Sequence, residues 1–437
     1  MTNENGTEVL INVIDSDYRE KNKIFAFFIL PIIITLFFIQ GLRAYAPGIY
    51  IGIFHVVFQD PGWIFSLMVL FTVILLILPV FSNALCSHFG EEKIYFTSII
   101  VIAASRLIMA FHLISILETI FAGIIVGFYG IFLSIFIKNL IKNPLNINDK
   151  SKIGIISFSI LIAFLIDALL RTIGLTSDIS LITWSLLPNF WYFIQYLWLI
   201  IQIPLSILSV YFSRSTNHLI FKGIDLKEKD KSIADKRNFW IIIAFGLGMF
   251  FFLSFNMFLY PNAIVEFATV NFATRISYNV INPIFICSLT FSVLYILFFK
   301  EKYILKKELI IIYNAIFLIS LILLLFVAGI MPSSCYIISI VMTVSLTFMF
   351  IDLHVLLVNI GIKNTKYVKL KSISNIISIG FLFYLLFVFL FDFTTDHAFT
   401  IEAFRGLGSI LTLICGISLG LISILAIYQI NKTTGGK

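Results

Sequence analysis

Charged side chains inside otherwise apolar stretches are the residues of this sequence that could do chemistry. Asp167 and Arg171 are four positions apart, so on a helix they share one face and can form an ion pair. Pairing reduces the cost of burying each charge in an apolar medium. One interpretation is a structural ion pair. The other is that Asp167 takes up a coupling proton and releases Arg171 to bind a ligand.

Two further arginines and one carboxylate fit the same pattern. Arg106 follows Lys93 by 13 residues, which is about 20 Å along a helix and places it beyond the middle of its apolar run. Arg43 closes the first apolar run, and Asp352 lies near His354 in a later one. Arg43 and Arg106 could donate hydrogen bonds to a substrate or could be paired structurally. Asp352 is a candidate coupling or substrate residue, since buried carboxylates in such runs are costly.

The elements that position these residues are predicted to be membrane-spanning helices. The chain has 437 residues, of which 60% are hydrophobic and 12% are charged, whereas soluble domains carry roughly 25% charged residues. Backbone groups in lipid must be satisfied within the segment, so helices are expected. The fold class is therefore all-α and polytopic, with about twelve spans near 24–46, 62–84, 94–113, 117–138, 153–172, 187–212, 238–262, 273–299, 308–330, 333–360, 371–391 and 403–430.

The positive charges predict the orientation. All 22 lysines, and 25 of the 30 basic residues, fall in alternate segments between the spans or at their edges. Basic residues in short loops favour the cytoplasmic side, so both termini are expected there, in a multi-pass protein of the cell membrane. The predicted organisation is a cytoplasmic segment (1–23), a six-helix bundle (24–212), a basic linker (213–237), a second six-helix bundle (238–430) and a tail (431–437).

Several function classes are disfavoured. The net charge of +7 lies mostly in these segments between spans, which argues for membrane topology and against nucleic-acid binding. No G-x-x-x-x-G-K-[ST] loop is present for ATP. The four cysteines are far apart without a C-x-x-C pair, so we expect neither a metal site nor a disulfide framework. We expect no cofactor, no enzymatic activity and no obligate protein partner.

Residues 83–93, NALCSHFGEEK, resemble the G-x-L-A-D-R-x-G-R-R turn of the major facilitator superfamily. Leu85, Phe89, Gly90 and Lys93 fit that pattern, whereas Ser87, Glu91 and Glu92 depart from it. Stretches around 42–47, 104–107 and 165–181 are also similar to little-characterised bacterial and archaeal members. The resemblance implies two pseudo-symmetric six-helix bundles that rock around a central substrate cavity. It also implies that Gly90 and Lys93 belong to a gating loop.

The function implied by this resemblance is secondary active transport of a small solute by alternating access, driven by an ion gradient such as protons. The expected partners are thus the lipid bilayer and a small solute. A lipid-linked glycan flippase or a membrane-embedded lipid- or glycan-processing protein is one alternative, and a non-transporting scaffold or sensor of the same fold is another. Five arginines against nine carboxylates lie outside the cytoplasmic segments, a balance of 5 − 9 = −4. The sequence therefore does not select an anionic substrate.

Overall fold

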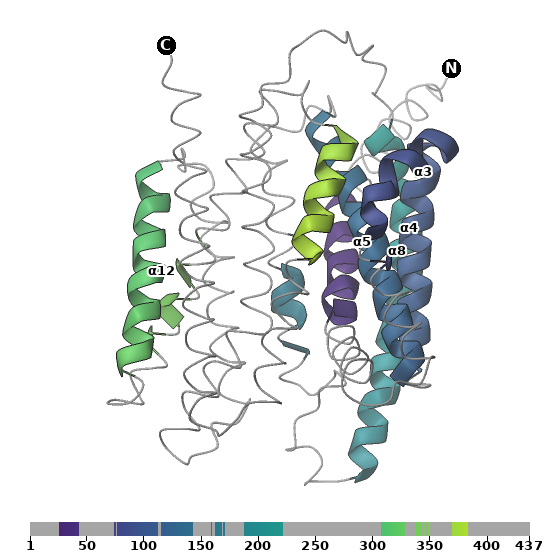
Figure 1. Ribbon diagram of the computed structural model, residues 1–437. Coiled ribbons are helices and arrows are strands. Elements are labelled where there is room, and N and C mark those ends of the chain that lie inside the picture. The colour runs from purple at the N-terminus through teal and green to yellow at the C-terminus, as the bar shows by residue number, and fades with distance from the viewer. Residues whose placement is uncertain are drawn as a thin grey trace, which may run out of the picture.

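The computed structural model describes residues 26–42, 74–111 except 76, 115–142, 159, 162–170 except 168, 188–221, 307–327, eight residues between 337 and 348, and 369–382. Within these ranges the regular secondary structure is helical. The helices are Ala26–Leu42, η1 (Leu78–Phe81), α3 (Ser82–Phe89), α4 (Glu91–Met109), α5 (Ser115–Lys142), α8 (Pro188–Phe221), α12 (Lys307–Val327) and Leu370–Leu382. Figure 1 shows α3, α4, α5 and α8 gathered on one side of the molecule and α12 on the other.

Most of these helices fall on the predicted spans, and α3 and α8 differ. α3 ends at Phe89, beyond the predicted end of its span at residue 84, so it occupies the start of the predicted loop. The apolar run predicted an end at residue 212, whereas α8 continues to Phe221 and so includes the start of the predicted linker. The extension is helical because one of its faces remains packed: Ser213 and Thr216 are fully buried and Ile220 is 2% exposed. The polar residues Ser213 and Thr216 therefore belong to the buried face of α8 and do not begin a loop.

α4 packs against both α5 and α8 and runs antiparallel to each. Tyr95 of α4 stacks on Phe132 of α5 with ring centroids 5.3 Å apart. Near one end of the bundle Glu92 of α4 accepts a hydrogen bond from the Asn217 amide of α8. Further along, the Ser206 hydroxyl of α8 donates to the Ala103 carbonyl of α4 at 3.4 Å. These two contacts set the register of the antiparallel pair: Glu92 is level with Asn217, and Ala103 is level with Ser206.

The polarity of α8 is inverted relative to a helix in water. Its buried face is polar, consisting of Gln202, Ser206, Ser209, Ser213 and Thr216. Its outer face is apolar, and Ile200, Ile207 and Tyr211 are 61%, 64% and 65% exposed. A helix with its apolar side turned outward is stable only where the surrounding solvent is itself apolar. Within the described residues, one helical segment, Thr119–Leu140 of α5, is long and apolar enough to cross a membrane.

Most hydroxyls on the buried face of α8 are satisfied by the helix itself. Ser209 donates to the Ser206 carbonyl, Ser213 to the Val210 carbonyl and Thr216 to the Phe212 carbonyl, at 2.7–2.8 Å. Serine and threonine make such bonds to the preceding turn in helices. Apart from Gln202, the polar face therefore presents short side chains, most of whose hydroxyls already donate within the helix.

Two glycines let α5 approach its neighbours closely. A Cβ atom at Gly127 would overlap the Leu75 carbonyl, and one at Gly130 would overlap the Pro79 ring and lie 3.0 Å from Phe381 Cε2. Small residues at helix contacts are typical of membrane proteins, where association depends on close packing. Helix Leu370–Leu382 thus meets α5 at Gly130. Figure 1 shows this yellow-green helix beside α5.

Candidate functional site

A buried hydrogen bond joins Arg106 to Gln40. Arg106 occupies the last turn of α4 and its Nε atom donates to Gln40 Oε1 of helix Ala26–Leu42 at 2.9 Å. Both residues are 7% exposed. The partial negative charge at the carboxyl end of α4 favours a cation there. Both roles considered for Arg106, substrate donor and structural partner, remain open, and its partner Gln40 is a site residue that the sequence did not indicate.

A second amide lies at the same level on α8. Ser206 of α8 contacts Ala103 of α4, and the two helices are antiparallel. One turn further from the Gly90 end, Gln202 of α8 therefore lies at the level of Arg106 of α4. Gln202 is fully buried. Among the described residues, neither amide atom of Gln202 nor Nε2 of Gln40 has a hydrogen-bond partner. The three side chains therefore form a polar layer, which we call the Arg106 layer: Gln40, Arg106 and Gln202.

The remaining predicted site residues divide into one that the structure describes and three that it does not. Asp167 lies in a helical stretch, residues 162–167, and is fully buried. This burial fits a carboxylate that faces the protein interior, because ionisable groups in spans avoid lipid. Arg43, Arg171 and Asp352 lie outside the described residues, so the pairing of Asp167 with Arg171 stays a prediction.

The predicted gating loop is a sharp turn between α3 and α4. Gly90 has φ 91° and ψ 140°, a conformation that favours glycine. Directly after it, Glu91 forms an ion pair with Lys138 of α5, and Glu92 is bonded to Asn217 of α8. Lys93 is exposed. The two acidic residues that depart from the family pattern therefore each have a partner on a neighbouring helix, which ties the turn to α5 and α8.

Cys86 lies on the last turn but one of α3, beside this turn. Its side chain is buried, and burial together with the nearby Glu91 carboxylate raises the pKa of the thiol to about 12. A thiol with so high a pKa remains protonated at neutral pH and is a poor nucleophile. Cys86 is therefore a packing residue of the turn.

An aromatic cluster lies next to the Arg106 layer, toward the Gly90 end of the bundle. Phe38 stacks on Tyr129 of α5 with centroids 4.0 Å apart, and the Tyr129 hydroxyl is 3.2 Å from the Thr35 hydroxyl. Phe381 of helix Leu370–Leu382 packs against Phe38 at 5.7 Å. Since Phe381 belongs to the predicted second bundle, this cluster joins segments from both predicted halves.

Comparisons with known proteins identify the fold through structure and not through sequence. No family model and no curated protein matches the sequence. Among solved structures, the proton:xylose symporter XylE is similar with a TM-score of 0.58 at 16% identity, covering 94% of this chain and 96% of that chain. The chain has the major facilitator fold. A bacterial homologue of the iron transporter ferroportin, in an outward-facing state, is similar with a TM-score of 0.54 at 11% identity over 91% and 98% of the two chains.

The major facilitator fold confirms the resemblance drawn from residues 83–93 and the all-α polytopic class. It is the fold of multi-pass membrane transporters, in agreement with the inverted polarity of α8. The count of twelve spans and the orientation of the termini stay predictions.

Proposed function

We propose that this chain is a secondary transporter that moves a small, oxygen-rich polar solute across the membrane by alternating access. The single observation that carries the proposal is the Arg106 layer. It places a guanidinium and two amides inside a bundle whose outer surface is apolar. Atoms of the Gln40 and Gln202 amides have no hydrogen-bond partner among the described residues, and such buried groups are costly, so their presence in such a bundle calls for a function.

The chemistry of this layer supports the choice of solute. The guanidinium carries five N–H donors, and the amides of Gln40 and Gln202 add donors that have no partner among the described residues. Gln202 Oε1 adds one acceptor. A donor-rich layer with a single cation suits hydroxyl, carbonyl or carboxylate oxygens. In the structure this layer is closed, so the solute would enter when the helices separate.

Transport by purified protein in liposomes tests the proposal. A panel of radiolabelled sugars, carboxylates, nucleosides and amino acids would be offered, with and without an imposed pH gradient. We expect uptake of one class and a loss of about tenfold or more in Arg106→Gln, since a hydrogen bond to a charged group contributes about 1.5–3 kcal/mol. Lys371→Gln, which removes an exposed positive charge, is the matched control. Unimpaired uptake by Arg106→Gln would contradict the assigned site, and no uptake of any class would contradict transport.

A further inference from the structure

Two cations stand at the lipid-facing edge of the α4–α8 pair. The exposed apolar stripe of α8 runs through Ile203, Ile207 and Tyr211 and continues on the same face to Arg214, which is exposed. On α4 the outward face includes Ile100, Thr97 and Lys93. Each stripe therefore ends in a positive charge at the end of the bundle that carries the Gly90 turn, which is predicted to be cytoplasmic.

Both cations lie at the same depth. The Arg214 guanidinium carbon lies 5.9 Å from the centre of the Phe96 ring of α4, within the range of a cation–π interaction. Lys93 is one turn from Phe96 on the same helix, about 4.5 Å along the axis. The neighbouring contact of Glu92 with Asn217 gives the same register. Arg214 is thereby held against an aromatic face at the level where Lys93 emerges.

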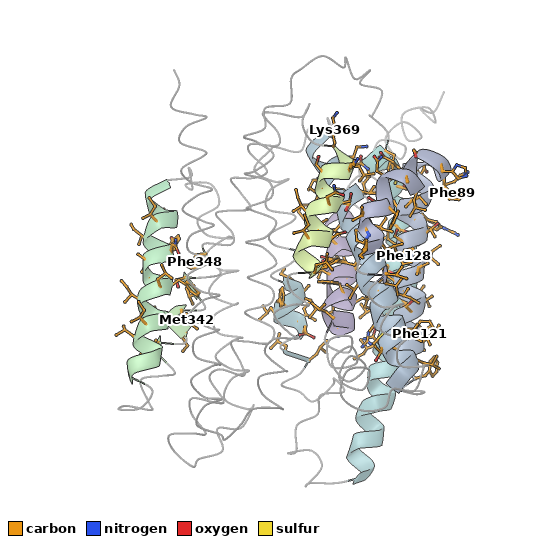
Figure 2. All side chains as sticks on the ribbon, in the orientation of Figure 1. Phe89, Phe121, Phe128, Met342, Phe348 and Lys369 are labelled. Atoms are coloured by element: carbon orange, nitrogen blue, oxygen red, sulfur yellow. The ribbon has the colours of Figure 1, made fainter. Side chains whose placement is uncertain are left out.

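The nearby carboxylates leave an excess of positive charge at this pair. Glu91 is paired with Lys138, whereas Glu92 accepts a hydrogen bond from the neutral Asn217 amide and keeps its charge, so two cations face one uncompensated carboxylate. Within the described part of the chain, neither Lys93 nor Arg214 forms an ion pair. The surroundings are those of a membrane interface: Phe81 and Phe89 are each 54% exposed, and Figure 2 shows Phe89 at the outer edge of the molecule. Aromatic side chains are enriched at that depth.

We propose that Lys93 and Arg214 bind the phosphate of an anionic phospholipid from the cytoplasmic leaflet, with its acyl chains along the apolar stripe of α8 and beside Ile100 of α4. Arginine offers a planar fork of donors that matches phosphate, and lysine adds a point charge. A lipid suits the site better than a soluble anion, because the cations are continuous with apolar surface. The lipid would bridge α4 and α8 on the side opposite to the Arg106 layer. The proposal depends on the predicted orientation and is independent of the identity of the solute.

Lipid binding by the full-length protein tests this site. Detergent-purified protein would be titrated with phosphatidylglycerol or with phosphatidylcholine of the same chains, and bound lipid would be counted by native mass spectrometry. We expect preferential retention of phosphatidylglycerol and an apparent Kd about tenfold weaker in the double variant Lys93→Gln/Arg214→Gln. The control Lys369→Gln/Lys371→Gln removes two exposed cations from the start of helix Leu370–Leu382 and should bind as the unchanged protein does.

Three outcomes would overturn the proposal: equal retention of both lipids, unchanged affinity in the double variant, or full displacement of the lipid by inorganic phosphate. Should the double variant fail to fold, Lys93→Arg/Arg214→Lys keeps both charges and should retain the lipid. The single variants Lys93→Gln and Arg214→Gln should each weaken its binding. Failure of the charge-preserving variant to retain lipid, or unchanged affinity in both single variants, would count against the proposal.

Discussion

Gln40 and Gln202 carry the same side chain but have opposite roles in the energetics of the Arg106 layer. Gln40 Oε1 accepts a charge-assisted hydrogen bond from Arg106 at 2.9 Å, and only the Nε2 atom of this amide has no partner among the described residues. Gln202 is fully buried, and its amide has no partner among the described residues. A buried polar group costs about 1–3 kcal/mol when its hydrogen bonds are unmade, whereas a satisfied one is neutral or stabilising. The two amides should therefore respond differently to removal.

Leucine substitutions at the two positions are expected to change stability with opposite signs. Gln202→Leu should raise the free energy of unfolding by about 1 kcal/mol, because an unsatisfied amide is replaced by an apolar group of similar size. Gln40→Leu should lower it, because Arg106 loses an acceptor. Thermal unfolding in detergent measures both. If Gln202 contacts the solute, Gln202→Leu should also transport more slowly despite its higher stability, a combination that a purely structural residue would not give.

Asp167 is the residue expected to couple transport to protons. Asp167→Asn keeps the size of the side chain but cannot exchange a proton, so accumulation driven by a pH gradient should be lost while exchange of solute for solute persists. Both can be measured in the same liposomes. Lys371→Gln, which changes an exposed charge outside the Gly90 turn and the Arg106 layer, serves as the control. Uptake that remains fully pH-dependent in Asp167→Asn would remove Asp167 from the coupling step.

At the scale of elements, α5 depends on glycine where it crosses its neighbours. At Gly127 the obstacle to a larger residue is the Leu75 backbone carbonyl, which cannot move without shifting its whole helix. At Gly41 the obstacle is the Ile125 side chain, with Cγ2 3.0 Å from an added Cβ. A side chain can change its rotamer, so the same added methyl group meets a rigid neighbour in one case and an adjustable one in the other.

Alanine at these two positions is expected to separate the two situations. Gly127→Ala should destabilise the protein by about 1–3 kcal/mol, the usual cost of overpacking. Gly41→Ala should cost less, since the Ile125 side chain can shift by a few tenths of an ångström. The midpoint of thermal unfolding in one detergent compares them directly. Equal losses of stability would show that the backbone contact at Leu75 is not the limiting one.

At the scale of the whole molecule, Phe381 connects the two predicted bundles. It packs on Phe38 and lies against Gly130, and Ser378, one turn earlier, is 2% exposed. Helix Leu370–Leu382 is thereby seated on the first bundle on the Gly90 side of the Arg106 layer. If the halves rock as the major facilitator fold implies, this contact has to open before the layer can be reached from that side.

Gly130→Ala is expected to favour opening of this contact. Its added methyl group would overlap the Pro79 ring and crowd Phe381. In a background with the four native cysteines replaced, Ser378→Cys reports opening through its rate of reaction with a maleimide. A destabilisation of about 1 kcal/mol should raise that rate about fivefold. Gly41→Ala, which does not touch Phe381, should leave it unchanged; an equal rise in both variants would contradict the assignment.

The sequence predicted most helices in the described ranges because apolar runs are local features, and it singled out Arg106 because a charge inside such a run is conspicuous. It did not predict Gln40 or Gln202, since neutral amides are less conspicuous than charges. The ion pair of Glu91 with Lys138 links positions 47 residues apart, and no local pattern encodes such a contact. The length of α8 was underestimated because Ser213 and Thr216 appear polar but turn inward.

The hydroxyls of α8 that bond back to their own helix have a mechanical consequence. Hydrogen bonds between two helices hold them in one register. Serine and threonine side chains that donate to their own helix make no such bonds and leave a surface of short side chains. Among the described side chains, α4 meets α8 partly through such a surface. The other contacts are the long Ser206 bond near mid-helix and, toward the Gly90 end, the Asn217 bond, the Tyr95–Phe221 ring contact and the cation–π contact of Arg214 with Phe96. A shift of α8 along α4 by a fraction of a turn would therefore break few interhelical hydrogen bonds. Such a contact suits two helices that move relative to each other during transport.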